Sequence, residues 1–299
     1  MKDCIILGGG PAGLTAALYL ARFLRSVTVF DAQEGRARMI PETHNLTPFP
    51  GGISGRDLLD RMRSHAGHHG AEIETGTVVS VEAQGDVFRV TTDRRAETAR
   101  TVIFASGVVN HRPPLSVSDH DRGVALGLIR YCPVCDAYEI RDRRIAVLGS
   151  GTHGFREARF LRHYSASVTL IPPDGSAAVA RDGVGVPGAP MAGLSLTESQ
   201  VVVTLENGEA LGFDTLYVAL GTTPRTALAA SLGVRLGTGG HVLVDARQKT
   251  GIDRVYAIGD VTDGLDQIAV AMGQAAVAAT AIHNTLPARL KSERSQMPL

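Results

Sequence analysis

The order of apolar and polar residues in the first part of the chain predicts a strand, a helix and a second strand. Residues 4–7 form a short apolar run that is typical of a buried strand, and residues 27–30 form another. Between them, residues 14–25 place small and apolar side chains on one side at helical spacing. A helix between two buried strands indicates a parallel βαβ unit.

The second half of the chain repeats this order. Residues 145–148 predict a strand, the residues up to about Tyr164 a helix, and residues 168–171 a second strand. Further strands are expected at residues 77–81, 87–91, 101–104, 201–205, 216–220 and 242–244. A last helix, built mostly of small residues, is expected at about residues 267–281. Two βαβ units in one chain predict an α/β protein.

Both predicted units carry a glycine-rich loop between the first strand and the helix. The loop glycines are Gly8, Gly10 and Gly13 in the first unit, and Gly149, Gly151 and Gly154 in the second. Both sets fit the pattern GxGxxG, which permits a tight turn, a close approach to a pyrophosphate and close packing of helix on strand. The helix N-terminus then faces the pyrophosphate. The chain is therefore predicted to contain two dinucleotide-binding folds.

The residue that follows the second strand differs between the two units. Asp31 ends that strand in the first unit, where a carboxylate can bind the hydroxyls of an adenosine ribose. In the second unit, the residue that lies as far from Gly149 as Asp31 lies from Gly8 is Pro172, which is followed by Pro173 and Asp174. Proline offers neither a carboxylate for NADH nor a cation for the 2′-phosphate of NADPH. We therefore expect the second loop to keep the glycines that can bind a pyrophosphate and to lack a residue that binds the adenosine ribose.

Cys132 and Cys135 are separated by two residues and are followed directly by Asp136. Such a pair can close a small disulfide, and a helix N-terminus can stabilise one of its thiolates. The alternatives are half of a metal site or two unrelated core thiols. A zinc site requires further ligands at suitable spacing, and the remaining cysteine, Cys4, lies in the first predicted strand. We interpret the motif as a redox dithiol with Asp136 as its proton donor or acceptor.

Composition and charge exclude several classes of protein. The 299 residues carry equal numbers of acidic and basic side chains, 30 of each, which gives no indication of binding to nucleic acid or an anionic membrane. We expect no signal peptide, no membrane span and a reducing cytoplasmic location.

His65, His68 and His69 lie close together in the sequence. We expect a solvated helix end there and no bound metal.

Together these stretches resemble the low-molecular-weight thioredoxin reductase group of flavin disulfide oxidoreductases, over nearly the whole chain. The resemblance implies two Rossmann-like, three-layer dinucleotide-binding domains, with the second inserted into the first. It places an FAD-binding domain at residues 1–114 and 242–299, and a CxxC-bearing, NAD(P)-binding-like domain at residues 115–241. It also implies a homodimer and a thioredoxin-like protein as partner.

The resemblance assigns roles to individual residues. FAD contacts are implied for Gly8, Gly10, Pro11, Ala12, Gly13, Asp31, Asn45, Gly107, Gly259, Asp260, Gln267 and Ile268. Asp260 would hold the ribityl chain. Cys135 would face the flavin, Cys132 would attack the disulfide of the partner, and Asp136 would be the acid.

The expected NADPH site departs from the family. Family members have an H-R-R-x-x-x-R run at the end of the second domain's second strand, and its arginines bind the 2′-phosphate. Here Pro172, Pro173 and Asp174 stand in its place, with Ala178 at the last arginine. The segment that follows is also shorter than in the family, as if a helix were missing. We therefore expect NADPH to be a poor reductant that is not clearly preferred over NADH.

These observations predict an FAD-dependent dithiol/disulfide oxidoreductase. Electrons would pass between flavin, the Cys132–Cys135 pair and an external disulfide in a protein or a small molecule. The electron donor would be a pyridine nucleotide or another donor such as ferredoxin. Two alternatives remain open: an oxygen-dependent oxidase that forms a disulfide in a small-molecule dithiol, and a flavin redox sensor without turnover.

Overall fold

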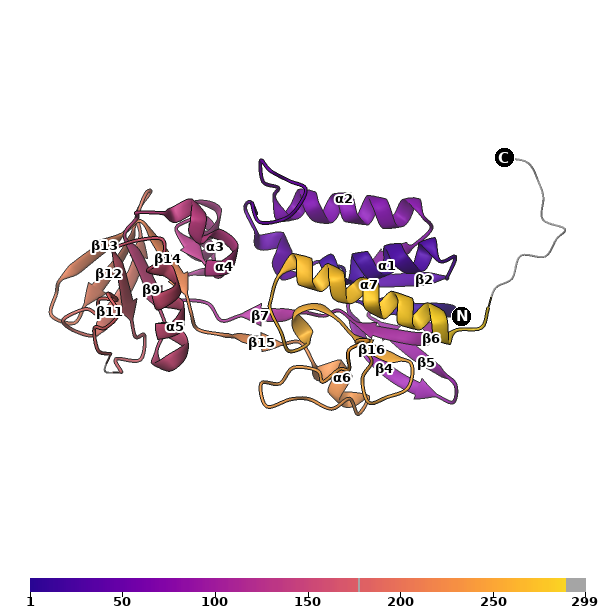
Figure 1. The fold of residues 1–299 in the computed structure, drawn as a ribbon. Helices are drawn as coiled ribbons and strands as arrows, with labels where there is room; N and C mark the ends of the chain where they lie inside the picture. The colour runs from indigo at the N-terminus through magenta and orange to yellow at the C-terminus, as the bar shows by residue number, and fades with distance from the viewer. Residues whose placement is uncertain (177, 289–299) are drawn as a thin grey trace. The chain divides into compact units, whose positions relative to one another are not determined.

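The computed structural model describes residues 1–176 and 178–288, which form two compact units (Figure 1). Unit 1 contains Met1–Gly35, Arg61–Gly107 and the described residues from Thr226 onward. Unit 2 contains Arg36–Asp60 and Val108–Arg225. The larger part of unit 2 therefore interrupts unit 1 in the sequence, which confirms the predicted insertion of one domain into another.

Unit 1 is built on a seven-stranded sheet with the order β3-β2-β1-β6-β5-β4, and β16 also pairs with β6. Its strands are β1 (Lys2–Leu7), β2 (Val27–Asp31), β3 (Glu72–Thr75), β4 (Val78–Gln84), β5 (Val87–Thr92), β6 (Ala96–Phe104) and β16 (Val255–Ala257). Strands β1, β2, β3, β6 and β16 pair in parallel, whereas β4 and β5 are antiparallel. The parallel part is the predicted Rossmann-like sheet.

Helices α1 (Pro11–Arg22) and α7 (Ile268–Thr285) lie side by side on the sheet of unit 1 (Figure 1). Alanines of both helices share one core with β1 and β2, and their small side chains let the helices approach closely. The other face of the sheet packs against the short helix α6 (Ala227–Ser231). Arg25 is buried and donates hydrogen bonds to the carbonyls of His283 and Pro287, which fixes the end of α7.

Unit 2 contains a four-stranded parallel sheet with the order β10-β9-β14-β8. Its strands are β8 (Ile129–Arg130), β9 (Ile145–Leu148), β10 (Val168–Ile171) and β14 (Thr215–Val218). Its helical segments are η1 (Arg36–Met39), α3 (Val117–Ala125), α4 (Pro133–Asp136), η2 (Ala137–Ile140) and α5 (Gly151–Leu161). Helix α5 connects β9 to β10, so this sheet is the second predicted Rossmann-like sheet.

Two further sheets complete unit 2. One is antiparallel and consists of β11 (Met191–Leu196), β12 (Val201–Leu205) and β13 (Ala210–Phe213). The other pairs β7 (Val108–Asn110) with β15 (Thr222–Pro224), the two strands at which the chain enters and leaves this part of the unit. Helix α2 (Gly55–His68) begins in unit 2 and ends in unit 1, and η3 (Gly259–Val261) belongs to unit 1.

The described residues between β10 and β11 form no helix. The chain instead runs along the edge of β10, where Leu170 N donates to Gly185 O and Gly185 N donates to Val168 O, each at 2.9 Å. Arg181 lies over the ring of Phe155, a residue of α5, at 3.9 Å. Among the described residues, turns and isolated bridges thus stand where the sequence indicated a missing helix.

Several predicted boundaries differ from the structure. Helix α1 ends at Arg22 because Leu24 has a positive φ of 59° and turns the chain toward β2. Val242, in a segment predicted as a strand, forms only isolated bridges. The segment 226–241 lies with unit 1 because Ala229 and Val234 are buried in its core.

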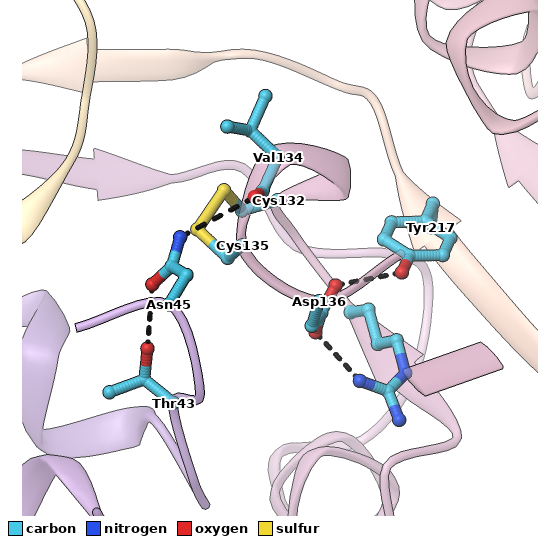
Figure 2. The surroundings of a disulfide bond; sticks show 8 residues. Thr43, Asn45, Cys132, Val134, Cys135, Asp136 and Tyr217 are labelled. Atoms are coloured by element: carbon cyan, nitrogen blue, oxygen red, sulfur yellow. Dashed lines mark hydrogen bonds and ion pairs between the residues drawn. A yellow bond between two sulfur atoms is a disulfide. The ribbon is translucent and has the colours of Figure 1, made fainter. Parts of the chain in front are cut away.

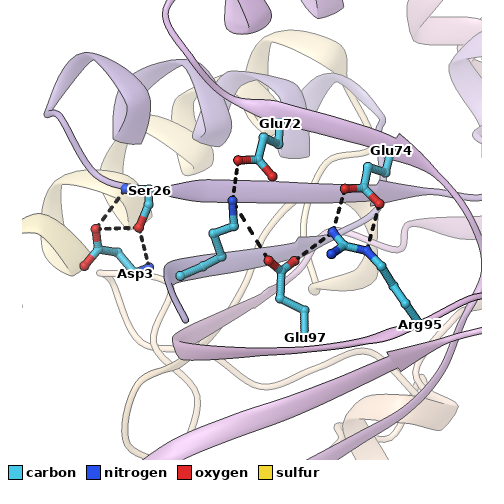
Figure 3. A network of polar contacts seen from close by, with 7 residues as sticks. Asp3, Ser26, Glu72, Glu74, Arg95 and Glu97 are labelled. Atoms are coloured by element: carbon cyan, nitrogen blue, oxygen red, sulfur yellow. Dashed lines mark hydrogen bonds and ion pairs between the residues drawn. The ribbon is translucent and has the colours of Figure 1, made fainter.

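An ion-pair network lies on the sheet of unit 1 (Figure 3). Lys2 contacts Glu72 and lies 3.9 Å from Glu97. Arg95 forms a bidentate pair with Glu74, at 2.6 and 3.1 Å, and is 3.3 Å from Glu97. The network therefore connects the edge strand β3 with β1 and β6.

Candidate redox and nucleotide sites

Cys132 and Cys135 form a disulfide with 5.2 Å between their Cα atoms. Cys132 is the N-cap of the short helix α4, and Pro133 occupies the first helical position, which its fixed φ suits. Cys135 N donates to Cys132 O at 2.9 Å, so the turn itself brings the two cysteines together. Both cysteines are partly exposed, whereas Cys4 is buried.

Asp136 is held by two donors that come from the sheet of unit 2 (Figure 2). Tyr217, a buried residue of β14, donates its hydroxyl to Oδ1 at 2.7 Å, and Arg130 at the end of β8 donates to Oδ2 at 2.7 Å. Burial raises the pKa of the Asp136 carboxyl, and the charge of Arg130 and the bond from Tyr217 oppose this only in part. A carboxyl of this kind suits proton transfer closer to neutral pH.

Asn45 lies on the other side of the disulfide turn (Figure 2). Its Nδ2 donates to the carbonyl of Val134, between the cysteines, at 3.4 Å, and its Oδ1 accepts from Thr43 at 2.9 Å. The structure therefore places Asn45 in unit 2 with the dithiol, while the other residues implied as FAD contacts lie in unit 1.

A buried histidine anchors the residue before the first cysteine. Tyr131 OH lies 2.7 Å from Nε2 of His120, and Nδ1 of His120 lies 2.8 Å from Oδ1 of Asp121. Burial raises the pKa of Tyr131 to about 12. The sequence reasoning missed this chain of contacts because it did not predict α3, the helix that carries His120.

Glu157 is a second functional candidate that the sequence reasoning missed. Burial in α5 raises its pKa to about 7, although the charge of Arg36 opposes the shift. Its Oε1 lies 3.3 Å from Nε2 of His153.

The described residues contain no group of three or more His, Cys, Asp or Glu side chains that could hold a metal ion.

The glycines of the unit 1 loop divide into two kinds. A Cβ on Gly8 would lie 2.2 Å from the carbonyl oxygen of Ala105, and a Cβ on Gly13 would lie 2.0 Å from that of Gly8. A Cβ on Gly10 would meet no atom within 4 Å. Packing thus requires glycine at positions 8 and 13, whereas Gly10 lies in open space next to the start of α1.

Asp31 lies directly against this loop. Its side chain is buried and forms an ion pair with Arg63 of α2, and its Oδ1 accepts from Gln33 N at 2.9 Å. A Cβ on Gly9 would lie 2.3 Å from Cγ of Asp31. The carboxylate is therefore fixed beside the second residue of the loop.

The other unit 1 residues implied as FAD contacts follow neighbouring strands. Because Leu7, Phe104 and Ala257 are in register across β1, β6 and β16, the loops after these strands meet at one edge of the sheet. Gly107 follows β6, while Gly259 and Asp260 follow β16 in η3. Gln267 is the N-cap of α7, and Ile268 is its first residue. Pro11 and Ala12 open α1.

A glutamine that the sequence reasoning missed fixes the loop after β16. Gln274 of α7 accepts from Gly259 N at 2.7 Å and donates to Thr262 Oγ1 at 3.4 Å. Gly259 has a positive φ of 74°, and a Cβ there would lie 3.0 Å from that of Ala12. The start of α1 and the loop that carries Asp260 are therefore in contact.

The unit 2 loop shows the same division of glycines. A Cβ on Gly149 would lie 2.8 Å from the carbonyl oxygen of Ala219, and a Cβ on Gly154 would lie 2.7 Å from the carbonyl carbon of Gly149. A Cβ on Gly151 would meet no atom within 4 Å. The glycines of this predicted nucleotide loop thus lie together, and Gly151 lies in open space at the start of α5.

Asp174 follows the end of β10 by three residues, and its Oδ1 accepts a hydrogen bond from Ser176 N at 3.1 Å. Hydrogen bonds from Ser176 lower the pKa of its exposed carboxyl. Pro172, the position that corresponds to Asp31 by spacing, is buried.

Comparisons with known proteins match nearly the whole chain. The family described as pyridine nucleotide-disulphide oxidoreductase matches residues 2–275. A thioredoxin reductase of Streptomyces clavuligerus is 31% identical over 325 aligned positions, which cover 100% of this chain and 98% of that protein. The match therefore includes both units.

Two solved structures resemble the fold closely. The thioredoxin reductase of Streptococcus pyogenes MGAS5005 has a TM-score of 0.86 and 27% identity, and the match covers 95% of this chain and 97% of that one. The crystal structure of HlmI has a TM-score of 0.86 and 26% identity, with 95% and 92% covered. Both matches extend over the two Rossmann-like sheets.

Proposed function

The chain belongs to the pyridine nucleotide-disulphide oxidoreductase family, and on this premise we propose that it is an FAD-dependent dithiol/disulfide oxidoreductase. It would pass an electron pair between flavin, the Cys132–Cys135 pair and an external disulfide. The observation that carries the proposal is the partly exposed disulfide followed by Asp136, whose carboxyl two donors from the sheet hold in place.

The residues of unit 1 fit FAD. The open position at Gly10 admits a pyrophosphate to the N-terminus of α1, and the fixed carboxylate of Asp31 can accept hydrogen bonds from a ribose. Asp260 is proposed to hold the ribityl chain, with Gln274 fixing its loop. FAD, when bound, supplies a two-electron carrier for the dithiol.

The dithiol chemistry proceeds in two exchanges. An electron pair and two protons convert the disulfide to two thiols. The Cys132 thiolate then attacks an external disulfide, forms a mixed disulfide and releases one substrate thiolate, which takes a proton. Cys135 attacks Cys132 in turn, which restores the disulfide and releases the second thiolate. We assign to Asp136 the transfer of these protons.

Further parts of the proposal come from the similarity to thioredoxin reductases. A thioredoxin-like protein or a small disulfide would be the electron acceptor, and the chain would act as a cytoplasmic homodimer. No helix in the part of the chain that the structure describes is long and apolar enough to cross a membrane. Ferredoxin remains an alternative electron donor.

An oxygen-dependent dithiol oxidase is a second candidate. It is favoured by the segment after β10, where Pro172, Pro173 and Asp174 replace the phosphate-binding arginines of the family and no helix follows among the described residues. In this direction a small dithiol reduces the Cys132–Cys135 disulfide, and oxygen is the final acceptor. A flavin sensor without turnover would show neither reaction.

The two cysteines should differ when each is replaced by serine. Cys135→Ser should abolish turnover but let Cys132 trap a partner as a mixed disulfide, whereas Cys132→Ser should trap none. Cys4→Ser, a change at a buried thiol, is the control. Trapping would be measured by mass spectrometry, and equal trapping by both variants would contradict the assignment.

The electron donor is tested separately. The flavin absorbance would be followed without oxygen after addition of NADH, NADPH or a dithiol in turn. Bleaching by a nucleotide supports the reductase direction. Bleaching by a dithiol alone, followed by recovery on admission of air, supports the oxidase.

A further inference from the structure

A buried histidine of unit 2 has no part in the dithiol chemistry described above. His120 lies in α3 and is only 1% exposed, yet both of its ring nitrogens have a polar partner. Nδ1 lies 2.8 Å from Oδ1 of Asp121, and Nε2 lies 2.7 Å from the hydroxyl of Tyr131. The rings of His120 and Tyr131 are also close, with their centroids 5.9 Å apart. Tyr131 directly precedes Cys132, so this chain of contacts ends at the redox disulfide.

The direction of these hydrogen bonds follows from the chemistry of the groups. A carboxylate only accepts, so Nδ1 of His120 carries the proton and donates it to Asp121. The other nitrogen of the neutral ring then accepts from the hydroxyl of Tyr131. Burial raises the pKa of Tyr131 to about 12, so this hydroxyl keeps its proton at neutral pH. Asp121 therefore sets the tautomer in which His120 binds Tyr131.

The helix that carries the histidine is itself held in place. A Cβ on Gly123 would lie 2.6 Å from the side chain of Ile129 and 2.8 Å from that of Leu196, so glycine lets α3 pack closely on β8 and β11. Leu128 N donates to Gly123 O at 2.8 Å. Arg122 Nη2 donates to Leu196 O at 3.4 Å. Helix α3 is therefore a fixed support for the ring that binds the tyrosine.

The two residues before the first cysteine are bound to different helices. Arg130 donates to Asp136 of α4 at 2.7 Å, and Tyr131 binds His120 of α3. Cys132 follows directly as the N-cap of α4. The backbone that leads into Cys132 is thus restrained at two successive residues.

Such a restraint bears on the equilibrium between disulfide and dithiol. When glutathione disulfide oxidises the pair, Cys132 and Cys135 lose two electrons and two protons and form their disulfide, and two glutathione thiols are released. The equilibrium constant measures the effective concentration of one cysteine thiol at the other. A first cysteine that is held beside the second raises this concentration, and one that moves freely lowers it.

We propose that Asp121, His120 and Tyr131 form a positioning chain that holds Cys132 beside Cys135 and thereby favours the disulfide over the dithiol. The inference deepens the proposed function, on which it rests for the redox use of the pair. His120 acts through Tyr131 and is a positioning residue rather than a catalytic one.

The redox equilibrium of the full-length FAD-loaded protein tests the proposal without turnover. The protein would be equilibrated without oxygen, at one pH, in buffers with defined ratios of reduced to oxidised glutathione. After an acid quench, free thiols would be alkylated, and the peptide that carries Cys132 and Cys135 would be measured by mass spectrometry. The buried thiol of Cys4 lies on another peptide and does not enter the result.

The variants are Tyr131→Phe, His120→Leu, the two combined, and His120→Gln. Tyr138→Phe is the matched control, because it removes the hydroxyl of an exposed tyrosine that follows Cys135 by three residues. Thermal unfolding of each variant, followed by circular dichroism, reports separately on stability.

Tyr131→Phe should lower the equilibrium constant for disulfide formation by about 3- to 10-fold, because one buried hydrogen bond is lost. His120→Leu should have a similar effect, and the combined variant should add little, because both changes remove the same contact. His120→Gln should restore part of the constant, since the amide oxygen of glutamine can accept from Tyr131. Tyr138→Phe should leave it unchanged.

Three results would overturn the proposal. They are an unchanged constant in Tyr131→Phe, even where the unfolding midpoint falls, effects of Tyr131→Phe and His120→Leu that add in full, and a Tyr138→Phe effect equal to that of Tyr131→Phe. If His120→Leu does not fold, Tyr131→Phe and His120→Gln decide the question.

Turnover with disulfides and an artificial electron donor tests the proposed function separately. A protein that turns over while its redox equilibrium ignores Tyr131→Phe refutes only the positioning chain. One whose equilibrium shifts as expected but which shows no turnover refutes only the function.

Discussion

The two units share one division of loop glycines and differ in the acid that follows the second strand. In both loops the first and last glycines are packed against backbone, and the middle glycine is open. Asp31 is buried and paired with Arg63, whereas Asp174 is exposed and accepts from Ser176 N. The path of the backbone thus requires the packed glycines in both loops, whereas the surroundings of the two acids differ.

This difference fits the proposal that unit 1 holds FAD as a resident cofactor. A buried, ion-paired carboxylate is rigid and suits a group that stays bound. An exposed carboxylate on a short loop costs little to solvate when the ligand leaves. Unit 2 also carries the disulfide of the proposed redox reaction.

The largest effect is expected at Asp136, the catalytic acid proposed for unit 2. Asp136→Asn should slow turnover by about 10²–10⁴-fold, because proton transfer to the leaving thiolates is lost. FAD content should not change, because the carboxyl lies in unit 2. Steady-state rates and flavin absorbance measure the two effects.

The pH profile sharpens this test. Because burial raises the pKa of Asp136, the change in rate caused by titration of this carboxyl, one limb of the pH–rate profile, should lie at a pH above the usual carboxyl range. Asp136→Asn should remove the limb, and Tyr217→Phe should move it to higher pH by removing a donor to the carboxylate. Asp142→Asn, at an exposed position of unit 2, is the control. An unchanged profile in both test variants would exclude Asp136 as the titrating group.

The packed glycines should show a graded loss of stability. Gly13→Ala should cost about 3 kcal/mol, because its Cβ would lie 2.0 Å from a backbone oxygen. Gly154→Ala should cost less, because its nearest contact would be 2.7 Å. Gly10→Ala, at an open position, is the control for Gly13→Ala. Urea unfolding measures all three, and an equal loss at Gly10 and Gly13 would contradict the division of the glycines.

The two acids should differ in their effect on FAD. Asp31→Asn should weaken FAD retention by about 1.5–3 kcal/mol, or about 10- to 150-fold, because a charged hydrogen-bond acceptor is lost. Asp174→Asn should leave FAD retention unchanged. Ultrafiltration followed by flavin absorbance measures retention. Equal FAD loss in both variants would mean that the two loops do not serve different ligands.

Local sequence patterns predicted most of the fold. The glycine loops, the strands beside them and the CxxC pair were recognisable because each depends on residues close together in the chain. Helix α3 was missed because its residues are mostly polar, although Ser116 accepts from Asp119 N at 3.1 Å, a capping contact that the sequence itself suggests.

The contacts that shape the candidate site were not predictable in this way. Tyr217 reaches Asp136 across 81 residues, and only the order β10-β9-β14-β8 brings their strand and helix together. The contact of Asn45 with the disulfide turn of unit 2 joins residues 89 positions apart, and the implied flavin contact of Asn45 stays a prediction.

The smallest effects are expected at the ion pairs on the two sheets. In unit 2, Asp214 accepts from Arg144 Nη2 at 2.8 Å and from Arg144 N at 2.9 Å, and these bonds lower its pKa. In unit 1, Glu97 joins Lys2 and Arg95 in a network (Figure 3). Asp214→Asn should cost no more than about 1 kcal/mol at pH 7, because solvent screens the pair, and Glu97→Gln should cost slightly more because two cations lose a partner.

The pH dependence of this cost follows from the direction of the shift. The folded pKa of Asp214 is depressed, so its contribution is present above the unfolded value of about 3.9 and is lost as the pH falls through the folded value. The unfolding midpoints of Asp214→Asn and the wild type should therefore differ at pH 7 and converge as the pH is lowered below about 4. Added salt should reduce the difference at pH 7. A difference that persists in acid would show that Asp214 acts through packing rather than charge.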